Sequence, residues 1–424
     1  PRQITWSRRT PGLIYFLNGQ GELCWFRAAG VAGLPPALGA ASALPAEPQR
    51  VRFEAAMTIR REDEFAEMFA QCWQGLANAF YDPQFHGVDW KAVRAKYQPV
   101  VSHVALREDM YALISLMLGE LNASHLGISG KLPVPQEATA ELGLIFDEQY
   151  RGRGLKIAEV VARGPCDRRG LDIKPGDILL AIDRVELTDQ VNLSRLLNNK
   201  ANETVLLDVI RDPSNPKTRR KVEVVPVDRR RMAQLMYERW VRKNAERVAQ
   251  ASQNRIGYIH IPSMDDNGLE VFVRSLYSDH FDKEGLIIDV RYNGGGFTHD
   301  HVLNYLAGKE HTFFRQRDGG IGLVLRSDQR RWTRPVVVLI NNRSYSDAEI
   351  FPHAFRTMGL GKLVGQATGG HVIGTTSMRL IDGSTFRLPR IGVFTAEGIN
   401  MEKQGVEPDV PVEVTFEDWK QGID

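Results

Sequence analysis

A serine that follows a hydrophobic strand has the surroundings that a nucleophile needs. Residues 335–341 predict a buried strand, and a short polar turn then leads to Ser346, which should open a helix. The turn exposes the side chain, and the amides and dipole of the helix favour developing negative charge. A serine in this position is more often a helix N-cap, Ser344 is a competitor for the role, and Pro352 removes an amide early in the helix.

A run of three glycines strengthens the case for Ser346. Residues 285–290 predict a second buried strand, which leads into Gly294, Gly295 and Gly296. Glycine lets the backbone approach a substrate closely and aim an N–H group at it. A triple glycine alone is weak evidence. The order of strand, glycine turn, strand and serine at a helix start favours a catalytic serine.

The segments around these motifs predict an α/β layer structure with some parallel pairing. The expected strands are 255–261, 285–290 and 335–341, and the expected helices are 269–277 and 302–307. A charged helix over residues 229–251 should connect this region to the preceding part of the chain.

The first 125 residues predict a hairpin, a linker and three helices. Two strand-like runs, 13–17 and 23–26, flank an Asn-Gly-Gln-Gly turn, and one hairpin cannot stand alone in water, so we expect it to be the last piece of something larger. The Pro- and Ala-rich segment that follows predicts a linker. Apolar spacings of three and four predict helices over 62–80, from about Trp90, and over about 108–118, and the last leads to Ser124 and His125.

The overall composition limits the classes of partner. The 424 residues, 43% hydrophobic, can bury the cores of two to four domains, and a formal net charge of +2 is too near neutral to predict a nucleic-acid or membrane partner. No apolar run is long enough to span a bilayer. Cys24, Cys72 and Cys166 lie far apart, so we expect neither a disulfide framework nor a zinc site, and a reducing, cytoplasmic compartment fits best.

Residues 137–228 resemble a PDZ domain. Short strands alternate with loops, and Leu142-Gly143-Leu144-Ile145 stands where such domains carry their carboxylate-binding loop. A glycine-containing loop exposes backbone N–H groups to a peptide carboxylate, while the adjacent strand edge pairs with the peptide backbone. We therefore expect these four residues to bind peptides.

Residues 52–424 as a whole resemble the tricorn proteases and, more distantly, the carboxy-terminal processing proteases. The glycine turn and serine helix carry the resemblance, together with the segments 359–365, 380–383 and 401–409. It implies a multidomain chain: a terminal β-propeller hairpin (1–32), a linker (33–51), a small helical domain (52–136), a PDZ-like β domain (137–228), a helical connector (229–252) and an α/β, crotonase-like serine-protease domain (253–424). It also implies a homohexamer that cleaves peptides, and both ends of this chain look truncated.

The two related families differ in the residue that acts as general base. Processing proteases carry a lysine some 25 residues after the serine, and His371 stands there in this chain. The tricorn arrangement takes its base from a Ser-His pair ahead of the PDZ domain, here Ser124 and His125, and an acid from Glu402. The resemblance thus implies that His125 activates Ser346, that Ser124 and Glu402 orient His125, and that the amides of Gly296 and Asp347 form an oxyanion hole.

Several alternatives stay open. His371 is a second candidate base, and the pair His299 and His301 is a weak metal candidate because the two rings diverge on a helix. No metal or organic cofactor is indicated. Substrate preference could rest on Arg315 or Asp318, which favour opposite charges. The rival functions are an inactive PDZ-containing peptide-binding scaffold and a processing protease of the Ser/Lys kind.

Overall fold

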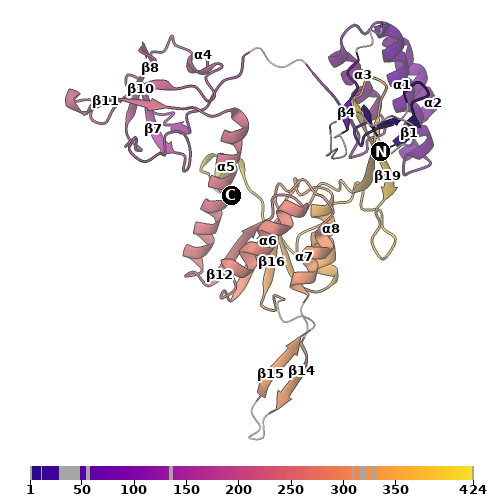
Figure 1. The fold of residues 1–424 in the computed structure, drawn as a ribbon. Coiled ribbons are helices and arrows are strands. Elements are labelled where there is room, and N and C mark those ends of the chain that lie inside the picture. The colour runs from indigo at the N-terminus through magenta and orange to yellow at the C-terminus, as the bar shows by residue number, and fades with distance from the viewer. Residues whose placement is uncertain are drawn as a thin grey trace, which may run out of the picture. The chain divides into compact units, whose positions relative to one another are not determined.

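The computed structural model describes residues 2–10, 12–27, 48–53, 58–132, 137–307, 310–315, 321–326 and 331–422. The chain divides into two compact units, Pro1–Arg61 and Glu62–Asp424. Figure 1 colours the ribbon along the chain and labels its elements. Each unit is described by itself below.

The first unit holds an antiparallel sheet in the order β1-β2-β3-β4. Its strands are β1 (Arg2–Trp6), β2 (Leu13–Leu17), β3 (Leu23–Arg27) and β4 (Gln49–Arg50). The hairpin predicted at 13–26 is confirmed, and the Asn18 side chain closes its turn by accepting from the backbone N–H groups of Gln20 and Glu22, both at 2.9 Å. Residues 49–50, predicted as linker, instead pair with β3, and residues 28–47 lie outside the described residues.

Three helices begin the second unit: α1 (Arg61–Ala79), α2 (Trp90–Val101) and α3 (Arg107–Gly119). The apolar stripe predicted along the first helix is buried in their common core. Strand β5 (Gly127–Ser129) follows and pairs with β19 (Thr385–Gly392), which in turn pairs with β18 (Ile373–Arg379). Leu380, Phe386 and Leu388 complete the helical core, so part of this core comes from the range 253–424, which was predicted as the α/β domain.

The next segment forms one antiparallel sheet, in the order β11-β10-β8-β7-β6 with β9 beside β8. Its elements are β6 (Leu144–Phe146), β7 (Leu155–Val160), β8 (Ile178–Ile182), β9 (Val185–Glu186), α4 (Leu193–Leu197), β10 (Val205–Ile210), the 3-10 turn Pro216–Thr218 and β11 (Arg219–Val224). These strands agree with the predicted ones to within a few residues. Strand β6, which follows the predicted peptide-binding loop, lies at the edge of the sheet.

A parallel sheet positions the predicted nucleophile. After the long helix α5 (Arg229–Ala251), the strands run in the order β12-β13-β16-β17-β20, and all their described pairings are parallel. The strands are β12 (Ile256–His260), β13 (Gly285–Asp289), β16 (Val336–Ile340), β17 (Gly361–Gly365) and β20 (Val410–Pro411), and the helices are α6 (Asp266–Ser278), α7 (His299–Leu306) and α8 (Asp347–Thr357). Because parallel strands share one carboxyl edge, the loops after β13 and β16 lie together.

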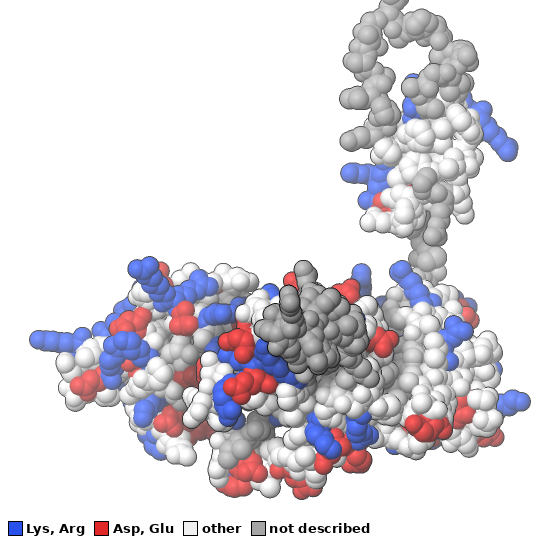
Figure 2. Space-filling view, turned by 90° about the horizontal axis from the view of Figure 1, so that it is seen from below, with Lys and Arg blue, Asp and Glu red and all other residues white. Residues whose placement is uncertain are grey.

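Two further elements belong to this region: the hairpin β14 (Glu310–Arg315) and β15 (Ile321–Arg326), and the short helix α9 (Phe416–Lys420). Within the described ranges, none of the helices combines the length and the apolar character needed to cross a bilayer. On the face shown in Figure 2, Lys and Arg are interspersed with Asp and Glu, in keeping with the small net charge.

Candidate active site

Ser346 occupies a sharp turn between β16 and α8. Its backbone adopts φ 57° and ψ −117°, a conformation that costs a non-glycine residue about 1–3 kcal/mol and that tends to occur at functional sites. Gly295 packs directly against this turn, because a Cβ atom at position 295 would lie 2.6 Å from the Cβ of Ser346. The glycine turn and the serine turn therefore meet, as predicted from their order in the sequence.

The buried Glu349 holds this strained turn in place. Its carboxylate is 0% exposed and accepts from the backbone N–H of Ser346 (3.2 Å), the hydroxyl of Thr368 (2.6 Å), and the N–H groups of Gly370 (2.6 Å) and His371 (2.7 Å). Its importance was not predicted from the sequence. The signal was available, since Ser-x-x-Glu before a hydrophobic helix is the pattern of a capping box.

We expect Glu349→Ala to destabilise the protein by about 3 kcal/mol or more, because removing one carboxylate leaves four donors, two buried and two partly buried, without their acceptor. Urea unfolding followed by circular dichroism measures this free energy. Glu270→Ala, which removes an exposed carboxylate from α6 of the same domain, should change the unfolding free energy by less than about 0.5 kcal/mol. Equal stability of the two variants would contradict the role assigned to Glu349.

His125 lies against the nucleophile. Its Nε2 atom is 2.9 Å from the Oγ of Ser346, and its Nδ1 atom is 2.7 Å from the Oγ of Ser124. The histidine is 4% exposed and has a positive φ of 62°, and its backbone N–H donates to the hydroxyl of Tyr345 at 3.1 Å. Residues 221 positions apart in the sequence thus meet through the packing of the helical core beside the parallel sheet.

A buried carboxylate completes a chain of four side chains. Glu402 is 5% exposed and accepts from the hydroxyl of Ser124 (2.8 Å), the N–H of Ser124 (2.7 Å) and the N–H of Val372 (2.9 Å). Because the Ser124 hydroxyl donates to the carboxylate, its oxygen is left to accept from Nδ1–H of His125. That tautomer leaves Nε2 as the acceptor for the Ser346 hydroxyl, which is the state a general base requires.

Burial, together with smaller contributions from the nearby Arg387 and His371, lowers the pKa of His125 from its usual 6.5 to about 4. The neutral imidazole is therefore the resting form near neutral pH. A depressed histidine pKa means that the base becomes protonated, and inactive, only when the pH falls through about 4.

We accordingly expect the acid limb of kcat/KM to have its midpoint near pH 4 instead of near 6.5. Arg387→Gln should move that midpoint to higher pH, because it removes a positive charge that opposes protonation of His125. Peptide hydrolysis measured from pH 3.5 to 8, with circular dichroism at each pH to establish that the protein stays folded, tests this. An acid limb that does not respond to Arg387→Gln would contradict the assignment.

Tyr345 is a part of the site that was not predicted from the sequence. Its ring stacks on that of His125, with 4.5 Å between centroids, and its hydroxyl lies 3.0 Å from Nδ1 of His125. His371, the alternative base, stacks on Tyr345 as well, at 5.3 Å. Among the described residues, His125 is the histidine that lies within hydrogen-bond distance of the Ser346 hydroxyl. In the sequence, the position of Tyr345 next to Ser346 was the only indication that this residue could belong to the site.

The two predicted oxyanion donors lie in the glycine turn and at the start of α8. Gly296 has φ 154°, and a Cβ atom there would lie 1.8 Å from the carbonyl oxygen of Met264, so the position requires glycine. Asp347 follows Ser346 as the first residue of α8. Its side chain is 2% exposed and accepts from the N–H of His299 at 3.1 Å, which makes the carboxylate a structural group.

Two other predicted residues, Ser344 and His299, take structural positions. Ser344 is 0% exposed, and its hydroxyl donates to the carbonyl of Val290 at 2.9 Å, so it is not a competing nucleophile. The His299 ring lies 2.5 Å from Asp347, whose hydrogen bond raises the pKa of His299. Within the described ranges, no three side chains of the kinds that bind metals converge. Arg315 ends strand β14, and Asp318 lies outside the described residues.

The predicted peptide-binding loop enters the edge strand of its sheet. Leu142 is buried, and Gly143 has φ 70°, with its carbonyl accepting from Val161 N–H at 2.9 Å. Leu144 and Ile145 belong to β6, whose only described strand partner is β7. One edge of β6 is thus left unpaired in the described part of the chain, as addition of a peptide strand requires.

Comparison with known proteins identifies three domains in this chain. Residues 255–412 match the model of peptidase family S41, residues 61–119 the tricorn protease C1 domain, and residues 154–229 the tricorn protease PDZ domain. The chain carries the domains of a tricorn-type serine peptidase. The resemblance to the tricorn proteases is thereby confirmed, and the PDZ domain with it.

Individual relatives show how far the similarity extends. A protein named as a tricorn-like protease C-terminal subunit, from Sulfurisphaera tokodaii, is 32% identical over 386 residues, which cover 86% of this chain and 42% of that protein. The crystal structure of the tricorn protease matches with a TM-score of 0.78 at 24% identity, over 100% of this chain and 40% of that one. The chloroplastic C-terminal processing peptidase of Tetradesmus obliquus is 24% identical, over 82% of this chain and 77% of that peptidase. The chain thus spans between 31% and 42% of the tricorn-type proteins that it matches.

Proposed function

We propose that this chain hydrolyses peptides through Ser346, His125, Ser124 and Glu402. The observation that carries the proposal is the continuous set of contacts from the Ser346 hydroxyl through His125 and Ser124 to Glu402, at 2.9, 2.7 and 2.8 Å. Neutral His125 takes the proton of Ser346 as the oxygen attacks a peptide carbonyl. The imidazolium that forms then returns a proton to the leaving amine, and water hydrolyses the acyl-enzyme by the same route in reverse.

The backbone amides of Gly296 and Asp347 stabilise the tetrahedral oxyanion in this proposal. Asp347 stands at the amino end of α8, where the helix dipole favours negative charge. The neighbouring Gly295 packs against Ser346, and the carbonyl of Met264 leaves room only for glycine at position 296. Loss of one such donor typically costs about 3 kcal/mol of transition-state stabilisation.

The remaining predictions stand as parts of the same proposal. The PDZ loop, Leu142 to Ile145, holds peptides by adding them to strand β6, and Arg315 or Asp318 sets the preference for the residue before the cut. The amino-terminal sheet is the end of a β-propeller, the α/β domain is crotonase-like, and the assembly is a cytoplasmic homohexamer. Three buried cysteines that form no disulfide, Cys24, Cys72 and Cys166, fit a reducing compartment.

A fluorophosphonate probe tests the proposal. The native protein, Ser346→Ala and His125→Ala are each treated with the probe and then assayed on a mixed peptide library. Labelling and cleavage by the native protein alone are expected, and the cut sites report the specificity. Labelling that persists in His125→Ala would assign the base to another residue such as His371. A folded native protein that is neither labelled nor active would favour the peptide-binding scaffold.

A further inference from the structure

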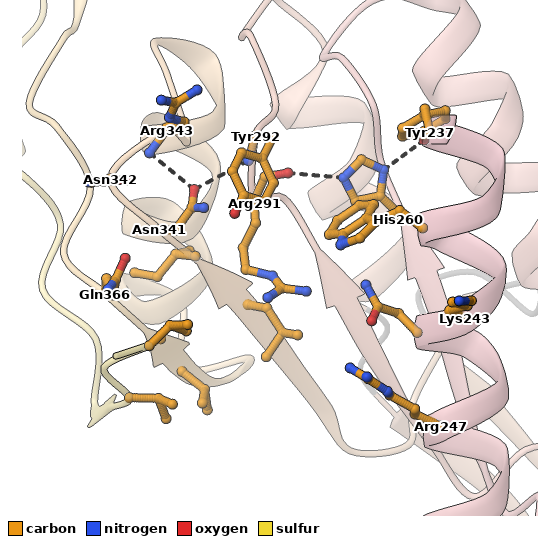
Figure 3. A pocket seen from close by; sticks show the side chains of 18 of the residues that line it. Tyr237, Lys243, Arg247, His260, Arg291, Tyr292, Asn341, Asn342, Arg343 and Gln366 are labelled. Atoms are coloured by element: carbon orange, nitrogen blue, oxygen red, sulfur yellow. Dashed lines mark hydrogen bonds between the residues drawn. The ribbon is translucent and has the colours of Figure 1, made fainter. Parts of the chain in front are cut away.

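A cavity of about 1110 Å³ lies between α5 and the carboxyl ends of β12, β13, β16 and β17 (Figure 3). Its helical wall includes Arg239 and, at spacings of three and four residues that put them on one face of α5, Tyr237, Trp240, Lys243, Asn244 and Arg247. The opposite wall consists of the strand ends and the loops after them. The cavity slightly exceeds the usual upper size of small-ligand pockets, so it has room for several residues of a peptide.

The charge of the lining is one-sided. Among the described residues it includes five cationic side chains and no carboxylate: Arg239, Lys243, Arg247, Arg291 and Arg343. Two carboxylates outside the lining offset part of this charge, since Glu159 pairs with Arg239 at 2.6 Å and Lys243 at 3.2 Å, and Asp289 pairs with Arg291 at 2.7 Å. The local excess of positive charge remains, and it favours an anionic ligand.

Arg247 and Arg343 are the arginines best placed to meet such a ligand. Arg247, whose guanidinium donates to the carbonyl of Gly422 at 2.9 Å, forms no ion pair with a carboxylate of the described chain, and neither does the exposed Arg343. Figure 3 shows the side chains of Arg247, from α5, and Arg291, from the end of β13, extending into the space between helix and sheet. A guanidinium donates in a planar fork that matches a carboxylate.

The same cavity offers apolar and aromatic surface. Trp240 meets the ring of Tyr292 edge-on at 5.7 Å, and Tyr292 remains 53% exposed. Val364, Val412 and Val414 also line it. A ligand that fits this lining combines carboxylates with apolar groups, as an acidic peptide does.

The cavity is next to the catalytic turn. The loop 291–296 begins in the cavity lining with Arg291 and ends at the glycines beside Ser346, and the loop 341–346 runs from the lining to Ser346 itself. The two loops are joined where Tyr345 N–H donates to the carbonyl of Asn293 at 2.9 Å.

We propose that this cavity binds acidic peptides at a site separate from the catalytic contacts of Ser346 and from the edge of β6. The choice of a peptide as ligand rests on the proposed function; the charge of the ligand rests on the lining alone. No step of peptide hydrolysis is assigned to the cavity. Its occupant is held by Arg247 and Arg343, with its apolar side chains against Trp240 and Tyr292.

Fluorescence anisotropy tests the proposal on the Ser346→Ala protein, which cannot consume the probe. The probe is a fluorescein-labelled hexapeptide with three glutamates and two leucines, and a lysine version of the same length is the comparison. We expect the acidic peptide to bind at least tenfold more tightly, and its affinity to fall as salt rises from 0.05 to 0.5 M. In the Ser346→Ala protein, a second substitution, either Arg247→Gln or Arg343→Gln, should weaken binding of the acidic peptide roughly tenfold. This is the usual loss for a charge-assisted hydrogen bond.

Lys362→Gln is the matched control, because it removes one exposed positive charge at the other end of β17 and should leave the affinity unchanged within twofold. Equal binding of the acidic and basic peptides would overturn the proposal. So would binding that neither arginine variant weakens, since the peptide would then occupy the PDZ edge or the catalytic cleft. The outcome is independent of the fluorophosphonate test, because a protein that fails to be labelled can still bind the acidic peptide.

Discussion

Ser346→Ala should lower the kcat for peptide hydrolysis by about 10⁴-fold or more and abolish labelling by fluorophosphonate. Without the hydroxyl, no acyl-enzyme forms, and only binding and oxyanion stabilisation by backbone amides are left, as in other serine hydrolases that lose their nucleophile. The folded protein should be preserved, because the Ser346 backbone is held through its N–H by Glu349 and not through the hydroxyl. Single-turnover kinetics and thermal unfolding of the same samples measure both effects.

Ser344→Ala is the matched control for this prediction. Its hydroxyl is buried and donates to Val290, so its loss should cost about 1–3 kcal/mol of stability. Labelling at Ser346 should nevertheless persist. The two serines lie two residues apart, and the pair of variants therefore separates a chemical role from a structural one. Residual turnover by Ser346→Ala at a tenth of the native rate would contradict the assignment of the nucleophile.

Glu402→Gln should lower kcat roughly 10³-fold with little change in KM. This loss of kcat is somewhat smaller than the loss seen when the carboxylate of a Ser-His-Asp triad becomes an amide. Three donors converge on this carboxylate: the hydroxyl and N–H of Ser124, and the N–H of Val372. A glutamine directs its own NH₂ group at one of them. The Ser124 hydroxyl then loses its acceptor, and the His125 tautomer that it selects is no longer favoured.

The measurement is steady-state kinetics beside the rate of fluorophosphonate labelling, which should be slowed and not abolished. Glu397→Gln, at an exposed glutamate in the same carboxy-terminal segment, should leave both rates unchanged. A kcat within threefold of the native value in Glu402→Gln would show that His125 is oriented without Glu402. Tyr345, whose hydroxyl also approaches Nδ1, would then be the group to examine.

Local sequence patterns were sufficient for the elements that carry the nucleophile. The hydrophobic runs that became β13 and β16 appear within one or two residues of their predicted bounds, and Ser346 does precede a helix. Such runs are informative because a strand buried in a parallel sheet must be apolar on both faces. The PDZ strands were predicted equally well for a related reason, since each lies between turn residues that end it.

Long-range pairing was not predictable in the same way. Strand β19, with β18 as its other neighbour, contributes to the helical core and pairs with β5, although more than 240 residues separate it from that strand, and nothing in its local pattern indicates that partner. Four donors meet on Glu349: one is three residues before it in the chain, and the other three are 19 to 22 residues after it. Tyr345 acquires a role only because the fold stacks it on His125. The strand pairing, the contacts of Glu349 and the stacking of Tyr345 all depend on which surfaces of the chain pack together. Side-chain periodicity does not specify which surfaces these are.

The sequence by itself determined the types of residue available for catalysis, the turn that exposes Ser346, and the glycines that its surroundings require. From the residues alone, however, His125, His371 and Ser344 were all open candidates for parts in the chemistry. Only the tertiary structure distinguishes them, by setting Nε2 of His125 at 2.9 Å from the Ser346 hydroxyl and burying Ser344 against Val290. The physical reason is that proton transfer depends on distances of a few tenths of an ångström, and those distances are fixed by packing between segments far apart in the chain.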